Sequence, residues 1–392
     1  MPFGTIVAAR AVRTLSYGAL SVFLAVLLAD KGLAPAQVGM LFTIALVSGA
    51  LSAVLLSRVA DRLGRRTVLI GGGLVTALAA ILLARAQGMP LLILAVALGT
   101  ISPSAAEVGP FGALEQAMLA QIVAPERRTR AFATYNLVGT FAIAVGALAA
   151  AVVSRAALLW AYLAVGLLLA GLYATLGPSV ELPPDARTAA RPREGTSAEP
   201  VAPRPRFGVV ERLTALFGLD ALAGGFVVQG FIAYWFHLRF GVDQRALGTL
   251  LFGANLLAAF SFPLAARLAE RFGLLNTMVF THLPSNVLLA LVPLMPTYPL
   301  AAVVLWARFA LSQMDVPTRQ AYTMAIVPPE ERARAAGLTN AVRPGAQAIS
   351  PILAGIAVQH AALGLPFVVS GVVKIVYDLA LYRIFKPVKL KS

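Results

Sequence analysis

A short charged turn occurs twice in this chain, and each copy separates two long apolar runs. The first copy, Asp-Arg-Leu-Gly-Arg-Arg at 61–66, and the second, Glu-Arg-Phe-Gly at 270–273, start 209 residues apart. Each starts 22 residues after a glycine in a similar apolar segment, Gly39 in one half and Gly248 in the other. The repetition predicts a chain made of two halves with one design.

Composition identifies the solvent of both halves. Hydrophobic residues make up 59% of the chain and charged residues 12%, with a mean hydropathy of +0.82, and such values are typical of a polytopic membrane protein. Since roughly 20 apolar residues cross the hydrocarbon as a helix, we predict an all-α membrane protein of twelve transmembrane helices in two pseudo-symmetric six-helix bundles. The predicted spans are 10–30, 36–57, 67–86, 90–122, 131–154, 157–177, 210–236, 246–267, 274–293, 298–327, 333–359 and 364–385.

The boundary between the halves is marked by a change of composition. Residues 178–208 are rich in proline and arginine and hold too few apolar side chains to build a core. We predict a linker there, extended where its prolines cluster. The two bundles are then expected over residues 1–177 and 209–392.

Basic residues predict the orientation, because short cytoplasmic loops of membrane proteins are enriched in Lys and Arg. By this division 23 basic residues fall on the side of the termini and the linker, against five in the opposite loops. Both termini are therefore predicted to be cytoplasmic, in a multi-pass protein of the cell membrane. The net charge of +15 follows from topology, and we expect no nucleic-acid partner.

Metal and enzyme chemistry find no support in the residue types present. The chain has no cysteine, and its three histidines, at 237, 282 and 360, lack the spacing of metal ligands. It also lacks a nucleotide-binding loop and a nucleophile elbow. We therefore expect no metal, no cofactor and no enzymatic activity.

A second repeat has a different offset. Residues 121–136 correspond to residues 325–340, 204 positions later, so the first half carries five extra residues between its third span and the end of its fourth. We place the surplus around residues 102–103 (Ser-Pro) and 109–112 (Gly-Pro-Phe-Gly), which predicts a kinked, bulged or unwound fourth helix. Broken helices at mid-membrane depth often mark transport sites, although a bulge without a ligand fits the sequence equally well.

With these features the chain resembles the major facilitator superfamily of secondary transporters. The resemblance rests on Gly39 with the 61–66 turn, on the echo at 270–273, and on Pro-Glu-Arg turns after the fourth and tenth spans. It implies a 6+6 bundle with a pseudo-twofold axis along the membrane normal and a central cavity lined mainly by spans one, four, seven and ten. It also implies a monomer in the lipid bilayer, with a small-molecule substrate and protons as the coupling ion.

The resemblance further implies that the first turn latches the cytoplasmic ends of the two bundles in the outward-open state. Glycine permits the sharp turn, and Asp61 is suited to accept from arginines or to cap a neighbouring helix N-terminus. The arginines also satisfy the positive-inside rule, so a purely topological role stays open for them. The gating residues implied in this way are Gly39, Asp61, Arg62, Gly64, Arg65, Arg66, Glu270, Arg271 and Gly273.

Charges inside the spans are the candidates for the transport pathway, because each would cost about 2.5 to 3.5 kcal/mol if it faced lipid. Lys374 and Asp378 lie four residues apart on span twelve, outside the expected cavity, and are predicted to form a structural pair. The seven predicted pathway residues are Glu107, Glu115, Asp220, Arg308, Asp315, Arg319 and Arg343.

Spacing adds geometry to these candidates. Arg308, Asp315 and Arg319 fall within about 40 degrees of one face of a helical span ten, although Pro317 disturbs a regular helix there. The 204-residue offset superposes Glu115 on Arg319 and predicts that they lie opposite each other. Substrate binding, proton exchange, a gate and a static ion pair between the bundles all stay open for this pair.

Two further residues have more local roles. Asp220, three turns into span seven, is the best isolated candidate for a protonatable carboxylate. A structural pair of Asp220 with Arg13 or another base of the first span is the alternative. Arg343 shares a face of span eleven with Asn340 and Gln347 and is predicted to contact an anion.

The leading functional prediction is a secondary active transporter that moves a small organic solute by alternating access, with proton-coupled efflux as its mode. Exporters of this kind commonly carry an arginine in the middle of span four. In this chain the only charged residues between positions 99 and 121 are Glu107 and Glu115. An uptake symporter or facilitator for an anionic metabolite, suggested by Arg319 and Arg343, is the alternative. A membrane sensor or scaffold that does not transport is the third candidate, but its marks, loss of the 61–66 turn or a large soluble appendage, are missing from the sequence.

Overall fold

The computed structural model describes residues 2–105, 109–181, 208–327 and 331–387. These residues form helices and connecting turns, without a strand among them. In the first half the elements are α1 (Pro2–Asp30), α2 (Pro35–Leu63), α3 (Arg65–Arg85), α4 (Met89–Ala97), α5 (Phe111–Ile122), α6 (Pro125–Val152), α7 (Arg155–Ala174) and the short 3-10 helix η1 (Pro178–Val180). In the second half they are α9 (Val209–Gly225), α10 (Gln229–Phe240), α11 (Gln244–Phe272), α12 (Leu274–Leu291), η2 (Val292–Leu294), α13 (Tyr298–Ser312), α14 (Asp315–Ile326), α15 (Arg332–Gln359) and α16 (Leu365–Phe385).

These helices make twelve spans, as the sequence predicts. Within the described residues, ten segments are long and apolar enough to cross a membrane, counting α9 and α10 as one segment. The other two spans are the pairs α4–α5 and α13–α14, each divided by a break. The predicted interruption of span four is confirmed, because α4 ends at Ala97 and α5 begins only at Phe111. The breaks after α9 and after α13 were not predicted.

The repeat seen in the sequence is also a repeat of packing. Gly39 of α2 lies so close to the α15 backbone at Pro351 that no Cβ fits between them, and Gly248 of α11 meets α6 at Ala147 in the same way. The two glycines are separated by the 209-residue offset, and their partners by the 204-residue offset. The two six-helix bundles are therefore joined by two pseudo-equivalent contacts, α2 on α15 and α6 on α11.

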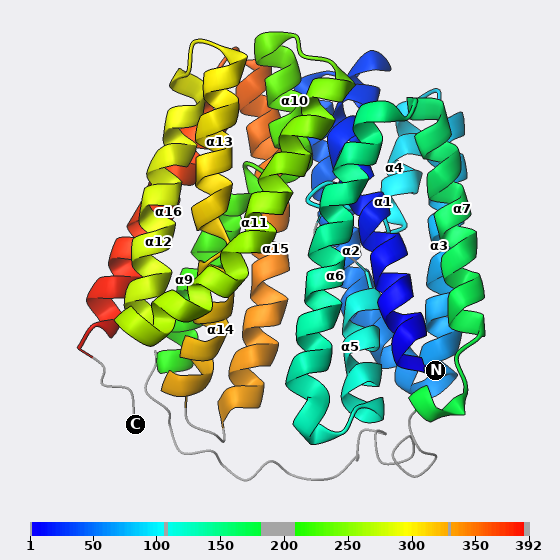
Figure 1. Ribbon diagram of the computed structural model, residues 1–392. Helices are drawn as coiled ribbons and strands as arrows, with labels where there is room; N and C mark the ends of the chain where they lie inside the picture. The colour runs from blue at the N-terminus through cyan, green and yellow to red at the C-terminus, as the bar shows by residue number, and fades with distance from the viewer. Residues whose placement is uncertain (1, 106–108, 182–207, 328–330, 388–392) are drawn as a thin grey trace.

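The two bundles meet at one end of the molecule. The start of α1 and the end of α16 lie at the lower end of Figure 1, which we call the terminal face, and the opposite end is the distal face. Near the distal face, Gln244 of α11 donates from Nε2 to the Ala150 carbonyl of α6 at 2.6 Å. Gln229 of α10 donates to Ser21 of α1 at 2.8 Å. These bonds hold the two bundles together at this end.

The buried apolar clusters also differ between the distal half and the terminal half of the molecule. The largest buried apolar cluster draws on both bundles, for example Phe42 of α2 and Trp235 of α10. Toward the terminal face, each bundle has a separate cluster, one containing Tyr173 and the other containing Tyr377. The molecule is thus closed by shared packing in its distal half, while its terminal half consists of two separately packed bundles.

Candidate functional site

The first charged cluster lies inside the N-terminal bundle. Arg13 of α1 donates from Nη1 and Nη2 to the two carboxylate oxygens of Glu115 of α5, at 2.8 and 2.6 Å. Arg13 is 1% exposed and Glu115 is 0% exposed. A bidentate pair of this kind is the strongest form of an arginine–carboxylate contact.

Two tyrosines complete this cluster. Tyr173 of α7 donates to Glu115 Oε1 at 2.6 Å and accepts a hydrogen bond from Arg13 at 2.8 Å. Tyr135 of α6 donates to Glu115 Oε2, also at 2.6 Å, while the Arg13 guanidinium lies over the ring of Phe111. Each oxygen of Glu115 thus receives two donors, and the pair ties together α1, α5, α6 and α7.

The second cluster lies inside the C-terminal bundle around Asp220 of α9. Three basic side chains from three other helices contact this one carboxylate. Lys374 of α16 donates to Oδ1, while Arg319 of α14 and Arg343 of α15 both donate to Oδ2, at 3.1 and 3.2 Å. The Asp220 side chain is 5% exposed, whereas that of Arg343 is 28% exposed. Arg343 is therefore the member of this set that is most open to its surroundings.

Further polar groups extend this second cluster. Asp315 pairs with Arg319 at 2.9 Å, one turn away on α14. His282 of α12 bonds through Nδ1 to Asp378 of α16 at 2.8 Å, and its Nε2 lies 3.9 Å from Asp220 Oδ1. Asn286, one turn along α12, donates to the other oxygen of Asp378 at 2.8 Å. A histidine thus stands between two carboxylates in the interior of the bundle.

The two clusters are pseudo-symmetric, with their charges exchanged. Gly18 of α1 meets the Ile143 carbonyl of α6 just as Gly225 of α9 meets the Gln347 carbonyl of α15, which sets an offset of 207 between α1 and α9. That offset superposes Arg13 on Asp220, and the 204-residue offset superposes Glu115 on Arg319. The base on the first helix of one bundle is thus an acid in the other, and its partner changes accordingly.

The structure excludes two pairings that the sequence left open and one that it predicted. Glu115 and Arg319 do not pair across the molecule, because each is bound within its own bundle. Asp220 does not pair with Arg13, whose carboxylate partner is Glu115. Lys374 and Asp378 do not pair either, since Lys374 reaches Asp220 and Asp378 bonds to His282 and Asn286.

Two pathway candidates, Arg308 and Glu107, are not part of either charged cluster as described. Arg308 lies on α13, on the other side of the span-ten break from Asp315 and Arg319, so the predicted continuous stripe is interrupted at residues 313–314. Within the described part of the chain, Arg308 forms no ion pair, and its guanidinium lies over the neighbouring Phe309 ring. Glu107 lies outside the described residues.

The 61–66 turn is fastened to its own bundle in this structure. Gly64 has φ +95°, a value suited to glycine, and α3 begins directly after it. The carboxylate of Glu181, just after η1, accepts hydrogen bonds from the backbone N–H groups of Arg65 and Arg66 at 2.8 and 2.9 Å. A carboxylate at a helix N-terminus is favoured both by the unpaired N–H groups and by the helix dipole.

The arginine side chains of this turn also bind within the N-terminal bundle. Arg65 donates to Gln121 of α5 at 3.0 Å and Arg66 to the Ala174 carbonyl of α7 at 2.5 Å, while Arg62 is exposed. The side chain of Asp61 lies outside the described part of the structure, so its gating role stays a prediction.

The second copy of the turn has the same backbone and fewer contacts. Gly273 has φ +83°, and both Glu270 and Arg271 are exposed. Arg271 lies over the ring of Phe272, 5.2 Å from its centre. Among the described residues, no three His, Cys, Asp or Glu side chains are grouped so that they could hold a metal ion.

The chain is similar to known membrane proteins over nearly its whole length. The model of the Major Facilitator Superfamily matches residues 6–312 and, in an overlapping second match, residues 214–391. An uncharacterized membrane protein of Saccharomyces cerevisiae, YJR124C, is 28% identical, with 97% of this chain and 93% of that protein covered.

Solved transporters share the fold at low sequence identity. The nucleoside transporter NupG matches with a TM-score of 0.73 and 14% identity over 98% of this chain and 99% of its own. The human organic anion transporter MFSD10 matches with a TM-score of 0.66 and 16% identity over 97% and 98%. A bacterial homolog of the human lysosomal transporter Spinster, in an inward-facing and unoccupied conformation, matches with a TM-score of 0.67 and 16% identity over 98% and 96%.

Proposed function

Since the chain belongs to the major facilitator superfamily and is a membrane transporter, we propose that it carries a small organic anion by alternating access and binds the anionic group at Arg343. The observation that carries this proposal is the position of Arg343 at the edge of the Asp220 cluster. Its side chain is 28% exposed, against 5% for Asp220 and 11% for Arg319.

The guanidinium of Arg343 has donors to spare. Its hydrogen bonds to Asp220 and to the Phe217 carbonyl, at 3.2 and 3.4 Å, both come from Nη1. A guanidinium presents five N–H donors in a planar fork that matches a carboxylate or a phosphate. An arriving anion would therefore use the remaining donors and compete with Asp220 for this side chain.

Competition between the substrate anion and Asp220 for Arg343 links substrate binding to a change of conformation. Asp220 connects α9 to α14, α15 and α16 through its three basic partners. Of these helices, α15 also packs against α2 of the other bundle. A substrate that takes Arg343 from Asp220 changes the contacts of the helix that joins the bundles, and a ligand shifts an equilibrium only through such differential contacts.

His282 supports proton coupling as part of the same proposal. A protonated His282 offers Asp220 a further cation, which weakens the hold of Asp220 on Arg343 and favours the anion there. Proton and anion then bind together, which favours cotransport, the alternative that the sequence left open. The charged and titratable groups around His282 are Asp220 on α9, Arg319 on α14, Arg343 on α15, and Lys374, Tyr377 and Asp378 on α16. The neutral amide of Asn286, one turn along α12, also lies beside it.

Proton-coupled efflux, the leading prediction from the resemblance, and the cell membrane as location both stay predictions. The test is uptake of labelled organic acids, sugars and cationic drugs into proteoliposomes that contain a pH dye. We expect an organic acid to enter together with protons, and Arg343→Gln to lose this uptake more than Arg343→Lys. Proton movement opposite to the solute would favour exchange, and transport of a neutral or cationic solute unaffected by Arg343→Gln would overturn the proposal.

A further inference from the structure

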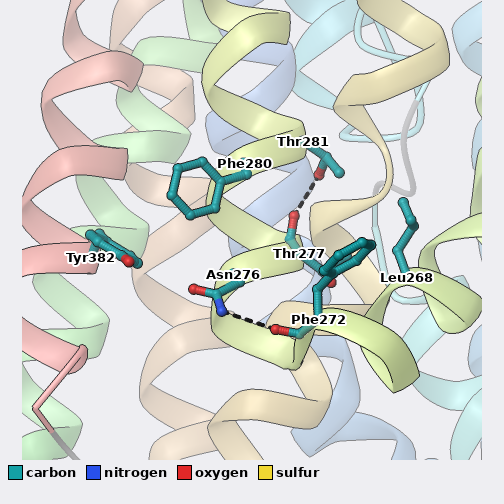
Figure 2. Close-up of a pocket in the computed structure, with 7 residues that line it drawn as sticks. All are labelled: Leu268, Phe272, Asn276, Thr277, Phe280, Thr281 and Tyr382. Carbon is teal, nitrogen blue, oxygen red and sulfur yellow. Dashed lines mark hydrogen bonds between the residues drawn. The ribbon is translucent and has the colours of Figure 1, made fainter.

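A hollow of about 470 Å³ lies on the outer flank of the C-terminal bundle, away from the charged clusters. It is formed between α11, α12 and α16 and is shown in Figure 2. Its lining residues are Leu268, Phe272, Asn276, Thr277, Phe280, Thr281 and Tyr382. The hollow combines aromatic rings with short polar side chains, which is unusual for a surface that faces hydrocarbon.

The surroundings show that this flank faces lipid. Large apolar side chains of the same three helices are exposed, including Phe260 of α11 at 61%, Phe280 of α12 at 57% and Leu379 of α16 at 56%. In a membrane protein such side chains contact acyl chains. Whatever fills the hollow therefore comes from the bilayer.

The polar part of the hollow lies near the terminal face, where headgroups are expected. Thr277 is in the first turn of α12, directly after the turn at Gly273, and Tyr382 is near the end of α16. Thr277 is 4% exposed, and its hydroxyl has no hydrogen-bond partner within the described residues. Asn276 donates to the Phe272 carbonyl at 2.9 Å, as Figure 2 shows. An ester carbonyl of a lipid is the acceptor that a bilayer supplies at this depth.

Two cations stand at the rim of the hollow. Arg271 lies over the ring of Phe272, with 5.2 Å to its centre, and Lys386 lies 5.2 Å from the centre of the Tyr382 ring. Both rings line the hollow. Basic pockets between transmembrane helices at the membrane surface attract anionic headgroups, at roughly a fivefold gain in binding per cation.

We propose that this hollow is a binding site for one anionic phospholipid. Its phosphate lies between Arg271 and Lys386, its glycerol esters lie at Asn276 and Thr277, and an acyl chain runs between Phe272 and Phe280. The site is separate from the proposed anion pathway, so the lipid is a bound component of the membrane and not the transported solute.

A tryptophan placed in the wall tests this site in the full-length protein. The parent has three tryptophans, Trp160, Trp235 and Trp306, whose emission is subtracted from that of Phe280→Trp. Purified protein in neutral detergent is titrated with brominated phosphatidylglycerol and, separately, with brominated phosphatidylcholine. We expect phosphatidylglycerol to quench the introduced tryptophan at about 25-fold lower concentration than phosphatidylcholine, because each of the two rim cations favours an anionic headgroup about fivefold.

Rim and control variants separate specific binding from general lipid contact. Adding Arg271→Gln and Lys386→Gln to Phe280→Trp should raise the half-quenching concentration of phosphatidylglycerol about 25-fold and leave that of phosphatidylcholine unchanged. Adding Arg127→Gln and Arg212→Gln, which removes two exposed cations elsewhere, should change neither. Equal quenching by the two lipids, no quenching, or an unchanged rim variant would overturn the proposal. Leu268→Trp, on the opposite wall, serves if Phe280→Trp does not fold.

Discussion

The two bundles carry buried charges at pseudo-equivalent positions, with the signs exchanged, but these charges have different numbers of partners. In the N-terminal bundle one arginine meets one carboxylate, and Tyr135 and Tyr173 saturate the pair. In the C-terminal bundle one carboxylate, Asp220, is shared among three basic side chains, and one of them is partly exposed. A saturated buried pair fixes geometry, whereas a shared carboxylate can exchange partners. We therefore propose a structural role for the first cluster and substrate binding for the second.

The largest effect is expected where the saturated pair is broken. Arg13→Met leaves Glu115 as an uncompensated buried charge, which costs about 3–5 kcal/mol and should lower the melting temperature by on the order of 10 °C. Arg13→Met combined with Glu115→Gln removes both charges, keeps an acceptor for one of the two tyrosines and offers an N–H donor to the hydroxyl oxygen of the other. This double variant should recover most of the loss, measured by intrinsic tryptophan fluorescence during heating. A double variant as unstable as the single one would contradict a purely structural pair.

The second largest effect is expected at Asp220, the carboxylate that three basic side chains share. Asp220→Asn removes the carboxylate that competes with the substrate for Arg343, so an organic anion should bind up to about 100-fold more tightly, since an ion pair of about 3 kcal/mol is lost. Transport should fall, because binding of the anion no longer changes the partners of Asp220. Binding is measured by isothermal titration and transport by tracer uptake. Asp378→Asn, which changes a carboxylate that does not contact Arg343, is the matched control and should not tighten binding. Weaker anion binding in Asp220→Asn would argue against competition.

A smaller effect is expected at the exposed edge of the cluster. Arg343→Gln removes charge-assisted hydrogen bonds worth about 1.5–3 kcal/mol and should raise the KM for uptake about tenfold or more. Arg343→Lys keeps the charge and should lie between wild type and Arg343→Gln, because it loses the planar fork. Both proteins should melt close to wild type, since the side chain is partly exposed. A KM that does not change would remove Arg343 from the binding site.

The smallest effect is expected on proton coupling, from substitution of His282. His282→Gln should flatten the dependence of uptake on pH, because it removes an imidazole that lies beside Asp220 and can offer it a further cation. His237→Gln, at the distal end of α10, is the control. An unaltered pH profile in His282→Gln would place the coupling group elsewhere.

Much of the fold was readable from the chain because apolar length and turn residues are local signals. The 209- and 204-residue offsets predicted the break between α4 and α5, since the surplus had to lie somewhere in span four. The break at residues 313–314 lies in the shorter of the two corresponding spans, so the surplus in span four gave no sign of it. The offsets of 207 at Gly18 and Gly225 and of 209 at Gly39 and Gly248 leave two extra residues between Gly225 and Gly248, a stretch that includes the break at residues 226–228. These first helices of the two halves were not aligned from the sequence. The Gly18 and Gly225 correspondence was visible in the sequence and would have aligned Arg13 with Asp220.

The partner of each charge was not readable, because it depends on how helices rotate and approach. Lys374 was paired with Asp378 from their four-residue spacing, yet both turn toward other helices. His282 was passed over because it lacks metal-ligand spacing. A better signal was its own four-residue spacing to Asn286 inside an apolar span, since two polar residues on one face of a membrane helix need a polar partner.

The most direct measurement compares the two clusters in one assay. Proteoliposomes with Arg13→Met and Glu115→Gln, with Asp220→Asn and Arg343→Gln, or with wild-type protein would be tested for uptake of the same labelled organic anion. If the N-terminal cluster is structural and the C-terminal cluster binds substrate, the first double variant keeps uptake within about threefold of wild type per folded protein, and the second loses it. Loss of uptake in the first variant with retention in the second would contradict this division of roles.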